Sequence, residues 1–306
     1  MKILVTGGAG FIGSHLVDKL IDHGDQVVVI DNLSTGRKEN LNPKATFYGF
    51  DICSPDIVGI FQKEKPEIVF HLAAQISVRF SVEDPANDAK TNIIGSINVL
   101  ENAKKYGIKK FIFASTGGVM YGDADIIPTP ETYVARPLCP YGICKLSVEH
   151  YLDYYEKVFG LRYAALRFGN VYGPRQNEKG EAGVVAIFCG KMIAGLECLI
   201  NGDGKQTRDY VYVKDIVAAA IAAMSDAVAG VYNIGTGKET DVNAIFAKLK
   251  KITGSRIEKI HGPVKKGEHR RGCLNSAKAA KDFGWWPKYD LDAGLKETAG
   301  WFVAKL

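Results

Sequence analysis

The sequence predicts an α/β fold built on a doubly wound parallel sheet, with a smaller, mainly C-terminal substrate-binding domain. Short, nearly continuous apolar segments alternate with longer amphipathic ones, as expected for strands that helices cover on both faces. A glycine-rich turn directly follows the first apolar segment. Small or polar residues follow several later ones. Because such sheets bind ligands at the carboxyl ends of their strands, we expect a site at that edge.

The elements are expected in the following order. The first part of the chain should contain strands at 3–5, 26–31, 45–50, 67–74, 110–114 and 162–167, and helices at 11–23, 86–106 and 141–159. The later part should contain helices at 183–194, 215–224, 241–253, 276–283 and 290–304, and strands at 208–213 and 230–235. We predict that residues 1–167 and 208–238 form the larger domain, and that 168–207 and 239–306 form the smaller one.

The composition excludes several classes of protein. The net charge of +5 is spread without a long basic run, which argues against nucleic-acid binding. We expect no membrane association, because no apolar run approaches the roughly 18–20 residues that span a bilayer. The chain opens on a strand without a signal-peptide layout, so we expect a cytoplasmic protein. Its six cysteines form no Cys-x-x-Cys pair, which predicts free thiols and no metal site.

The glycine-rich turn has the spacing of a dinucleotide-binding motif. Gly7, Gly10 and Gly13 lie three residues apart, and Gly8, Gly10 and Gly13 also fit Gly-x-Gly-x-x-Gly. Such glycines permit a tight turn and a close approach of the backbone to a pyrophosphate at the helix N-terminus. The motif alone would be weak evidence, but here it follows a strand and precedes an amphipathic segment, as the motif requires.

Asp31 ends the second predicted strand, roughly 20 residues after the glycines, where a carboxylate can accept hydrogen bonds from an adenosine ribose. This position favours NAD over NADP, because a 2′-phosphate would meet a negative charge. Arg37 and Lys38 lie close by and leave NADP as an alternative.

Tyr141 and Lys145 are four residues apart at the start of a predicted helix and therefore share one face of it. A nearby ammonium should lower the phenol pKa from about 10, so that the tyrosine can act as a general base. A packed aromatic beside a solvated lysine is the plainer interpretation, and it would be preferred for an isolated pair. The dinucleotide motif favours the catalytic one. We expect His71 to be a packed strand residue without a chemical role.

Three segments together resemble the extended short-chain dehydrogenase/reductase family, whose larger domain is Rossmann-like. They are Thr6–Gly13, Tyr141–Lys145 and Arg208–Val213. The resemblance extends over essentially the whole chain and is greatest to the UDP-glucose (UDP-galactose) 4-epimerases. The segments Asn170–Arg175 and Arg208–Tyr210 are typical of the branch that acts on nucleotide sugars.

The resemblance implies roles for individual residues. The catalytic residues would be Thr116, Tyr141 and Lys145, with Ser115 as second choice for the hydroxyl. NAD would contact Gly7, Gly10, Phe11, Ile12, Asp31, Asn32, Asp51, Ile52, Leu72, Ala73, Ala74, Asn92, Tyr141, Lys145 and Phe168. A UDP-sugar would contact Thr116, Asn170, Val185, Arg208 and Lys265. Where the family usually has an arginine, Lys265 offers a point charge instead of a bidentate fork. A homodimer formed through helices 86–106 and 141–159 is also implied.

The function implied is an NAD-dependent UDP-hexose 4-epimerase, which interconverts UDP-glucose and UDP-galactose through a 4-keto sugar. A small gate at Gly272 or Cys273 would also admit the N-acetylhexosamine pair. Related 4,6-dehydratases and decarboxylases are disfavoured because no acid accompanies Thr116 in Thr116-Gly117-Gly118, and NADPH-dependent reductases are disfavoured by Asp31. A non-catalytic protein that binds NAD or a nucleotide sugar remains the alternative from another class.

Overall fold

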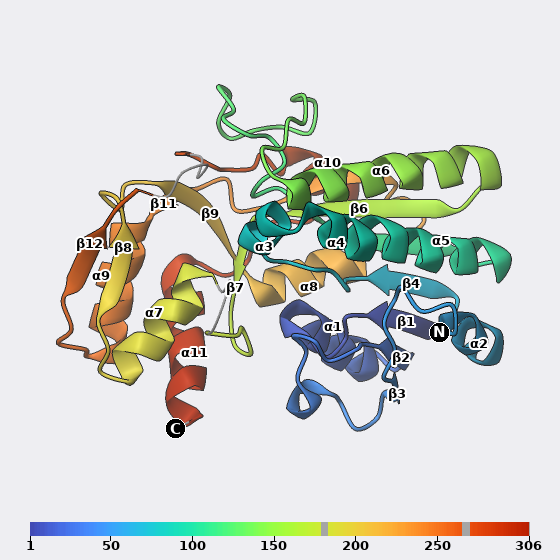
Figure 1. Cartoon of the computed structure of the whole chain (residues 1–306), viewed down its shortest axis with the longest axis horizontal. Coiled ribbons are helices and arrows are strands. Elements are labelled where there is room, and N and C mark those ends of the chain that lie inside the picture. Colours follow the sequence, from blue (N-terminus) through green and yellow to red (C-terminus); the bar gives the residue numbers. More distant parts are fainter. Residues whose placement is uncertain (179–182, 265–269, 306) are drawn as a thin grey trace.

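The computed structural model describes residues 1–178, 183–264 and 270–305. Its larger part is a seven-stranded sheet in the order β10-β6-β5-β4-β1-β2-β3, and all neighbouring strands pair in parallel (Figure 1). The predicted doubly wound fold is confirmed. The strands are β1 (Lys2–Thr6), β2 (Gln26–Ile30), β3 (Thr46–Tyr48), β4 (Ile68–His71), β5 (Lys110–Thr116), β6 (Arg162–Phe168) and β10 (Gly230–Ile234).

Helices cover both faces of this sheet. One face carries α1 (Phe11–Asp22), α8 (Val213–Ala222) and α10 (Ala277–Phe283), and the other carries α2 (Ile57–Glu64), α5 (Ser96–Lys105) and α6 (Pro140–Phe159). Side chains alternate along each strand, so Ile3 and Val5 pack on the first face while Leu4 packs on the second. Burial on both sides explains why the strands are apolar almost throughout.

The strand order reverses direction around β1. The chain leaves β1 to form β2 and β3 on one side, and then crosses to β4, β5 and β6 on the other. Helices on the two sides of such a switch point leave a crevice at the carboxyl ends of the strands. The segments that follow β1, β4 and β5 therefore meet at one edge of the sheet, where the sequence places most of its candidate residues.

The helix expected at 86–106 is present, but a π-helical turn interrupts its α-helical geometry. The chain forms α3 (Val78–Glu83), α4 (Pro85–Ala89), a π-helical turn η2 (Lys90–Gly95) and then α5. Asn92 lies in this turn and is buried rather than solvated, and its carbonyl accepts a hydrogen bond from Ser96 Oγ at 2.7 Å. Gly95 lets the turn pack closely, since a Cβ there would lie 2.8 Å from Ile52 Cδ1. Such turns widen a helix locally and are frequent at functional sites.

A smaller domain, at the left of Figure 1, packs around its own apolar core. Its core contains Tyr172, Phe188, Tyr212, Phe246 and Leu295. One sheet has the order β11-β9-β7 and the other pairs β12 with β8. The elements are β7 (Asn170–Tyr172), α7 (Val184–Ile193), β8 (Cys198–Asn201), β9 (Thr207–Tyr212), β11 (Glu239–Asp241), α9 (Val242–Thr253), β12 (Lys259–Gly262) and α11 (Leu291–Ala304). Asp241 caps the N-terminus of α9, because its Oδ1 accepts the Ala244 N–H at 2.7 Å.

The chain crosses between the two domains more than once. After β7, β8 and β9 it returns to the large sheet as α8 and β10, and then leaves it again. Strand β9 pairs with β7 and β11, which favours counting it with the smaller domain, whereas the sequence predicts it in the larger one. The full domain division stays a prediction.

Within the ranges described above, no helix combines the length and the apolar character needed to cross a membrane. The same ranges hold no group of histidine, cysteine or acidic side chains that could bind a metal ion. All six cysteines are free thiols.

Candidate active site

The turn after β1 is packed so closely that only glycine fits at two of its positions. Gly7 has φ +73°, and a Cβ there would lie 2.7 Å from the Ala73 nitrogen after β4. A Cβ on Gly13 would lie 2.1 Å from the Gly7 carbonyl oxygen. Helix α1 follows without a side-chain cap and without an acidic residue in its first turn. Its first N–H groups therefore remain suited to an anion such as a pyrophosphate.

The carboxylate of Asp31 lies at the end of β2, beside this turn. Its Oδ2 accepts the Ala9 N–H at 3.0 Å and its Oδ1 accepts the Leu33 N–H at 2.8 Å, which hold the side chain in place. Arg37 donates to Asn177 Oδ1 at 3.1 Å and lies 3.7 Å from Glu39. A 2′-phosphate would thus meet the fixed charge of Asp31, while the guanidinium of Arg37 is engaged elsewhere. This arrangement favours NAD.

The end of β4 adjoins the glycine turn. Thr6 Oγ1 accepts the Ala73 N–H at 3.2 Å and lies 2.7 Å from His71 Nδ1. Nε2 of His71 lies 2.8 Å from Ser96 Oγ, and burial lowers the pKa of His71 to about 3. His71 is therefore a neutral, packed strand residue, as expected. Its contacts join β1, β4 and α5 below the site.

Asn92 and the residues after β4 form a hydrogen-bonded unit. Asn92 Oδ1 accepts the Gln75 N–H at 2.9 Å, and Asn92 Nδ2 donates to the Gln75 carbonyl at 2.9 Å. The same amide donates to Asp88 Oδ1 at 2.9 Å. These bonds fix the chain beyond Ala74.

Two other predicted NAD contacts are joined to each other, since Asn32 Nδ2 donates to Asp51 Oδ2 at 2.8 Å.

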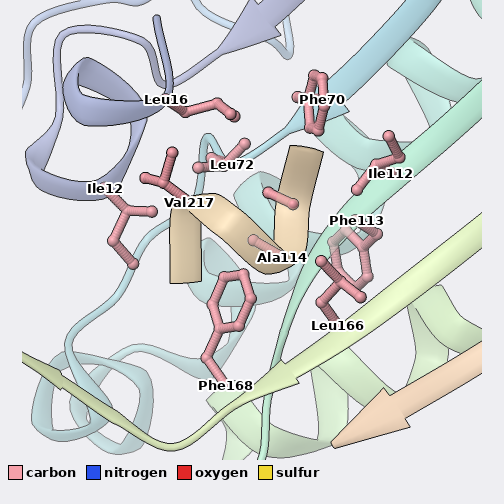
Figure 2. A pocket seen from close by; sticks show the side chains of 11 residues that line it. Ile12, Leu16, Phe70, Leu72, Ile112, Phe113, Ala114, Leu166, Phe168 and Val217 are labelled. Carbon is pink, nitrogen blue, oxygen red and sulfur yellow. The ribbon is translucent and has the colours of Figure 1, made fainter. Parts of the chain in front are cut away.

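A small cavity lies inside the core between α1, α8 and the sheet. Figure 2 shows that Leu16 and Val217 from the helices and Phe70 from the sheet line it, together with Ile12, Leu72 and Phe168. Its whole lining is apolar, so it offers no partner to a polar cofactor and is a gap in core packing. Three of the predicted NAD contacts therefore turn their side chains to the core, and they could reach the cofactor through their backbone.

Tyr141 and Lys145 share one face at the start of α6, as predicted. Lys145 Nζ lies 5.8 Å from the centre of the Tyr141 ring and donates to the Ala114 carbonyl at 3.0 Å. Burial lowers the pKa of Lys145 to about 8. The expected fall in the Tyr141 pKa is wrong for the protein alone, because burial raises it, and nearby Cys139 and Asp88 add to the rise. At this distance, the lysine charge does not compensate for the desolvation of the phenolate.

The structure separates the two candidate hydroxyls at the end of β5. Ser115 Oγ donates to Glu149 Oε1 at 2.6 Å, and Glu149 also forms a buried two-point ion pair with Arg167 at 3.0 and 2.6 Å. Arg167 donates further to the Tyr121 hydroxyl at 2.8 Å, which donates to Asn233 Oδ1 at 2.7 Å. Ser115 therefore belongs to a buried network below the site.

Thr116 lies closer to the predicted sugar contact. A Cβ built on Gly118 would lie 3.9 Å from Thr116 Oγ1 and 3.5 Å from Asn170 Oδ1, so both polar groups lie beside this glycine. The geometry supports Thr116 as the first choice for the hydroxyl. The sequence did not identify Glu149 or Arg167, because a charged residue in an apolar segment does not reveal its partner.

Leu274 is a further residue that the sequence did not identify. A Cβ on Gly117 would lie 2.4 Å from Leu274 Cδ1, so the leucine occupies the space that a side chain at position 117 would need. Because 157 residues separate the two positions in the numbering, no local signal could reveal this contact. The end of β5 is thus covered by an apolar side chain at Gly117.

The remaining predicted substrate contacts lie in the smaller domain. Val185 is buried in the core of that domain, so only its backbone could meet a ligand. Arg208 Nη1 donates to the Thr207 carbonyl at 2.8 Å. Of the two gate candidates, Cys273 is buried with its thiol 3.8 Å from Asp209 Oδ2, while Gly272 is half-buried. Lys265 lies outside the described residues.

Comparison with known proteins identifies the family. Residues 3–235 match the NAD dependent epimerase/dehydratase family. The UDP-glucose 4-epimerase of Thermotoga maritima, solved with UDP-glucose, is 53% identical with a TM-score of 0.98, and the match covers 100% of this chain and 99% of that one. The Thermus thermophilus UDP-glucose 4-epimerase, solved with NAD, is 40% identical with a TM-score of 0.96 and full coverage of both chains. A UDP-N-acetylglucosamine 4-epimerase of Methanobrevibacter ruminantium, solved with UDP-N-acetylmuramic acid, is 36% identical with a TM-score of 0.94, covering 100% and 99%.

The chain belongs to the NAD dependent epimerase/dehydratase family, and it is an enzyme that uses NAD. The resemblance to the UDP-glucose 4-epimerases, inferred above from three segments, is confirmed over the full length of the chain. The glycine turn and Asp31 fit this cofactor, because a side chain at Gly7 or Gly13 would clash with the backbone and the carboxylate is held at the end of β2.

The two hydroxyls at the end of β5 should respond differently to removal. We expect Thr116→Ala to lower turnover about a hundredfold while leaving stability nearly unchanged, because the loss of one positioned donor acts mainly on the reaction. Ser115→Ala should lower the free energy of unfolding by about 1 kcal/mol, since it removes a bond to Glu149, and should leave turnover nearly intact. Steady-state rates and urea denaturation measure the two effects. The reverse pattern would assign the hydroxyl to Ser115.

Proposed function

We propose that this enzyme interconverts UDP-glucose and UDP-galactose by inverting C4 through a 4-keto sugar. The observation that carries the proposal is the end of β5, where Thr116 lies beside Asn170 at Gly118 and an apolar side chain, Leu274, packs on Gly117 in place of an acid. A dehydratase must protonate a departing hydroxide, which requires such an acid. A site that has an acid–base tyrosine and no such group at this strand end favours reversible oxidation without elimination.

In this proposal each catalytic residue has a role in proton transfer or positioning. Tyr141 takes the proton of the sugar 4-hydroxyl and later returns it to the 4-keto oxygen. Thr116 orients the reacting hydroxyl, and the charge of Lys145 favours the phenolate. NAD held at the glycine turn would supply the group that takes up the C4 hydride and gives it back to the opposite face of the turned sugar. With a pKa of about 8, Lys145 stays largely protonated at neutral pH.

Binding is divided between the two domains in the same proposal. The N–H groups at the start of α1 hold the pyrophosphate, and Asp31 accepts hydrogen bonds from the adenosine ribose. Asn170, Arg208, Lys265 and the backbone at Val185 hold the UDP-sugar. Arginine on a diphosphate gives a strong, directional contact, which lets the nucleotide stay bound while the sugar turns.

Product analysis tests the proposal directly. The NAD-loaded protein should convert UDP-galactose to UDP-glucose, with no 4-keto-6-deoxy sugar and no decarboxylation of a UDP-uronate. Because Gly272 is small, UDP-N-acetylgalactosamine should also be converted. Chromatography of the products distinguishes these outcomes. A protein that binds NAD and converts no UDP-hexose would instead be a non-catalytic binder. Conversion of UDP-galactose without conversion of UDP-N-acetylgalactosamine would contradict the prediction that a small residue at the gate admits N-acetylated sugars.

Tyr141→Phe tests the acid–base role. The variant keeps the ring and loses the hydroxyl, so we expect bound NAD to remain and epimerisation to fall by about a hundredfold or more. Cofactor content is measured by absorbance after denaturation, and turnover by product formation. Undiminished turnover with full NAD content would remove Tyr141 from the mechanism.

We also propose that two copies of the chain pair through α5 and α6. The exposed face of α6 carries the apolar side chains Ile143, Tyr151, Tyr154 and Val158, spaced so that they follow one side of the helix. A large apolar stripe of this kind marks an interaction surface. This face extends toward Ile94 in η2, which is also exposed.

Light scattering should report a mass near twice that of the chain. The double variant Tyr154→Glu with Val158→Glu should halve it, because four charges would face one another in the pair. Val303→Glu is the matched control, since Val303 is equally exposed but lies on α11. A monomeric wild-type protein would contradict the proposed pairing.

A further inference from the structure

Asp209 lies buried where three segments of the chain meet. Its Oδ1 accepts the Thr236 N–H at 2.8 Å and the Thr236 hydroxyl at 2.6 Å. Its Oδ2 accepts the N–H groups of Gly237 and Leu274, both at 3.1 Å. One carboxylate thus joins β9, the turn after β10 and the segment that contains Leu274.

These bonds take the place of an ion pair. Only 2% of Asp209 is exposed, and no cation among the residues that the structure describes pairs with it. Burial raises the pKa of its carboxyl group, and the four donors act in the opposite direction. A carboxylate in this setting is stabilised by its hydrogen bonds alone, so the position of each donor group is strongly constrained.

The joined segments surround the sugar side of the site. A Cβ on Gly169 would lie 2.9 Å from the Asp209 carbonyl oxygen, and the next residue, Asn170, pairs with Tyr210. Arg208 precedes Asp209 on the same strand. Leu274, whose N–H is bound by Asp209, covers Gly117.

A second set of bonds ties the Leu274 segment to the loop between β5 and α6. The Thr129 N–H donates to the Cys273 carbonyl at 2.9 Å, and the Asn275 N–H donates to the Thr129 carbonyl at 2.9 Å. At its start, Arg270 pairs with Asp203 and Arg271 with Glu239. The segment is therefore held from both domains, and Asp209 supplies its buried attachment next to the site.

We propose that Asp209 is a positioning residue for the sugar nucleotide, holding Arg208, Asn170 and Leu274 in the arrangement that binds a uridine diphosphate sugar. The inference rests on the proposed function for the identity of the ligand. Asp209 touches neither the glycine turn nor Asp31, and its donors come from residues 236–237 and 273–274. Cofactor binding should therefore not depend on it.

Asp209→Asn tests the inference with little change in volume. Whichever way the amide is oriented, its NH₂ group meets at least one backbone N–H that now binds an oxygen. We expect the Kd for UDP and the KM for the UDP-hexose to rise about tenfold, the equivalent of roughly one hydrogen bond, while kcat and NAD content stay within about twofold. Calorimetry on the NAD-loaded full chain measures the Kd.

Asp215→Asn is the matched control. Asp215 is equally buried and accepts the N–H groups of Lys288 and Tyr289 at 2.9 and 3.1 Å, but it lies at the start of α8. The Asp215→Asn variant should lose about as much thermal stability as Asp209→Asn does, and it should bind UDP with the wild-type Kd. Equal weakening of UDP binding in both variants would show that the role of Asp209 is only structural.

Thr236→Val keeps the test valid if Asp209→Asn does not fold. It removes one of the bonds to Asp209, from the Thr236 hydroxyl to Oδ1, together with the bond that this hydroxyl accepts from the Lys238 N–H at 3.2 Å. A smaller rise in the Kd for UDP is therefore expected, with NAD content unchanged. An unchanged Kd, or loss of NAD together with UDP, would overturn the inference. A wild-type protein that binds UDP but forms no epimer would contradict the proposed function and leave the inference standing. A wild-type protein that does not bind UDP would overturn the inference.

Discussion

The buried ion pair between Glu149 on α6 and Arg167 on β6 is the interaction on which the site geometry depends. Tyr141, Lys145 and Glu149 lie four residues apart along one side of α6. The pair therefore fixes the rotation and height of that helix against the end of β5, where Ser115 adds a third bond. Losing one partner would leave an unpaired buried charge, which costs about 3–5 kcal/mol. The main effect of the pair is therefore to position α6 relative to the end of β5.

The same need for alignment explains why polar groups are buried around the rest of the site. Asp31, Asn92 and Asp209 each hold backbone N–H groups of a different segment. Backbone donors inside a protein must be satisfied, and a side chain that satisfies donors from two segments also sets the distance between them. The crevice at the edge of the sheet is shaped by such bonds, while the two apolar layers provide most of the driving force for folding.

Much of this arrangement could be predicted from local patterns. Each of these patterns spans only a few residues, so it can be interpreted from the sequence alone. They are the apolar strands, the glycine turn and the spacing of Tyr141 and Lys145. The predictions failed where distant groups compete. Within the helical segment at 86–106, residues 90–95 form a π turn, at which Gly95 packs against Ile52. The Tyr141 pKa rises because burial outweighs the charge of Lys145, whose Nζ lies 5.8 Å from the ring centre.

The sequence by itself determined the doubly wound sheet and the cofactor class and predicted the Tyr141–Lys145 pair, because periodicity, glycine spacing and i to i+4 geometry are properties of short stretches. Only the tertiary structure placed Ser115 in a buried network and Thr116 beside Asn170. Only it showed Leu274 over Gly117 and Asp209 among donors from residues 236–237 and 273–274. These relations join residues far apart in the chain, and a sequence pattern carries no measure of the distance between them until the backbone has folded.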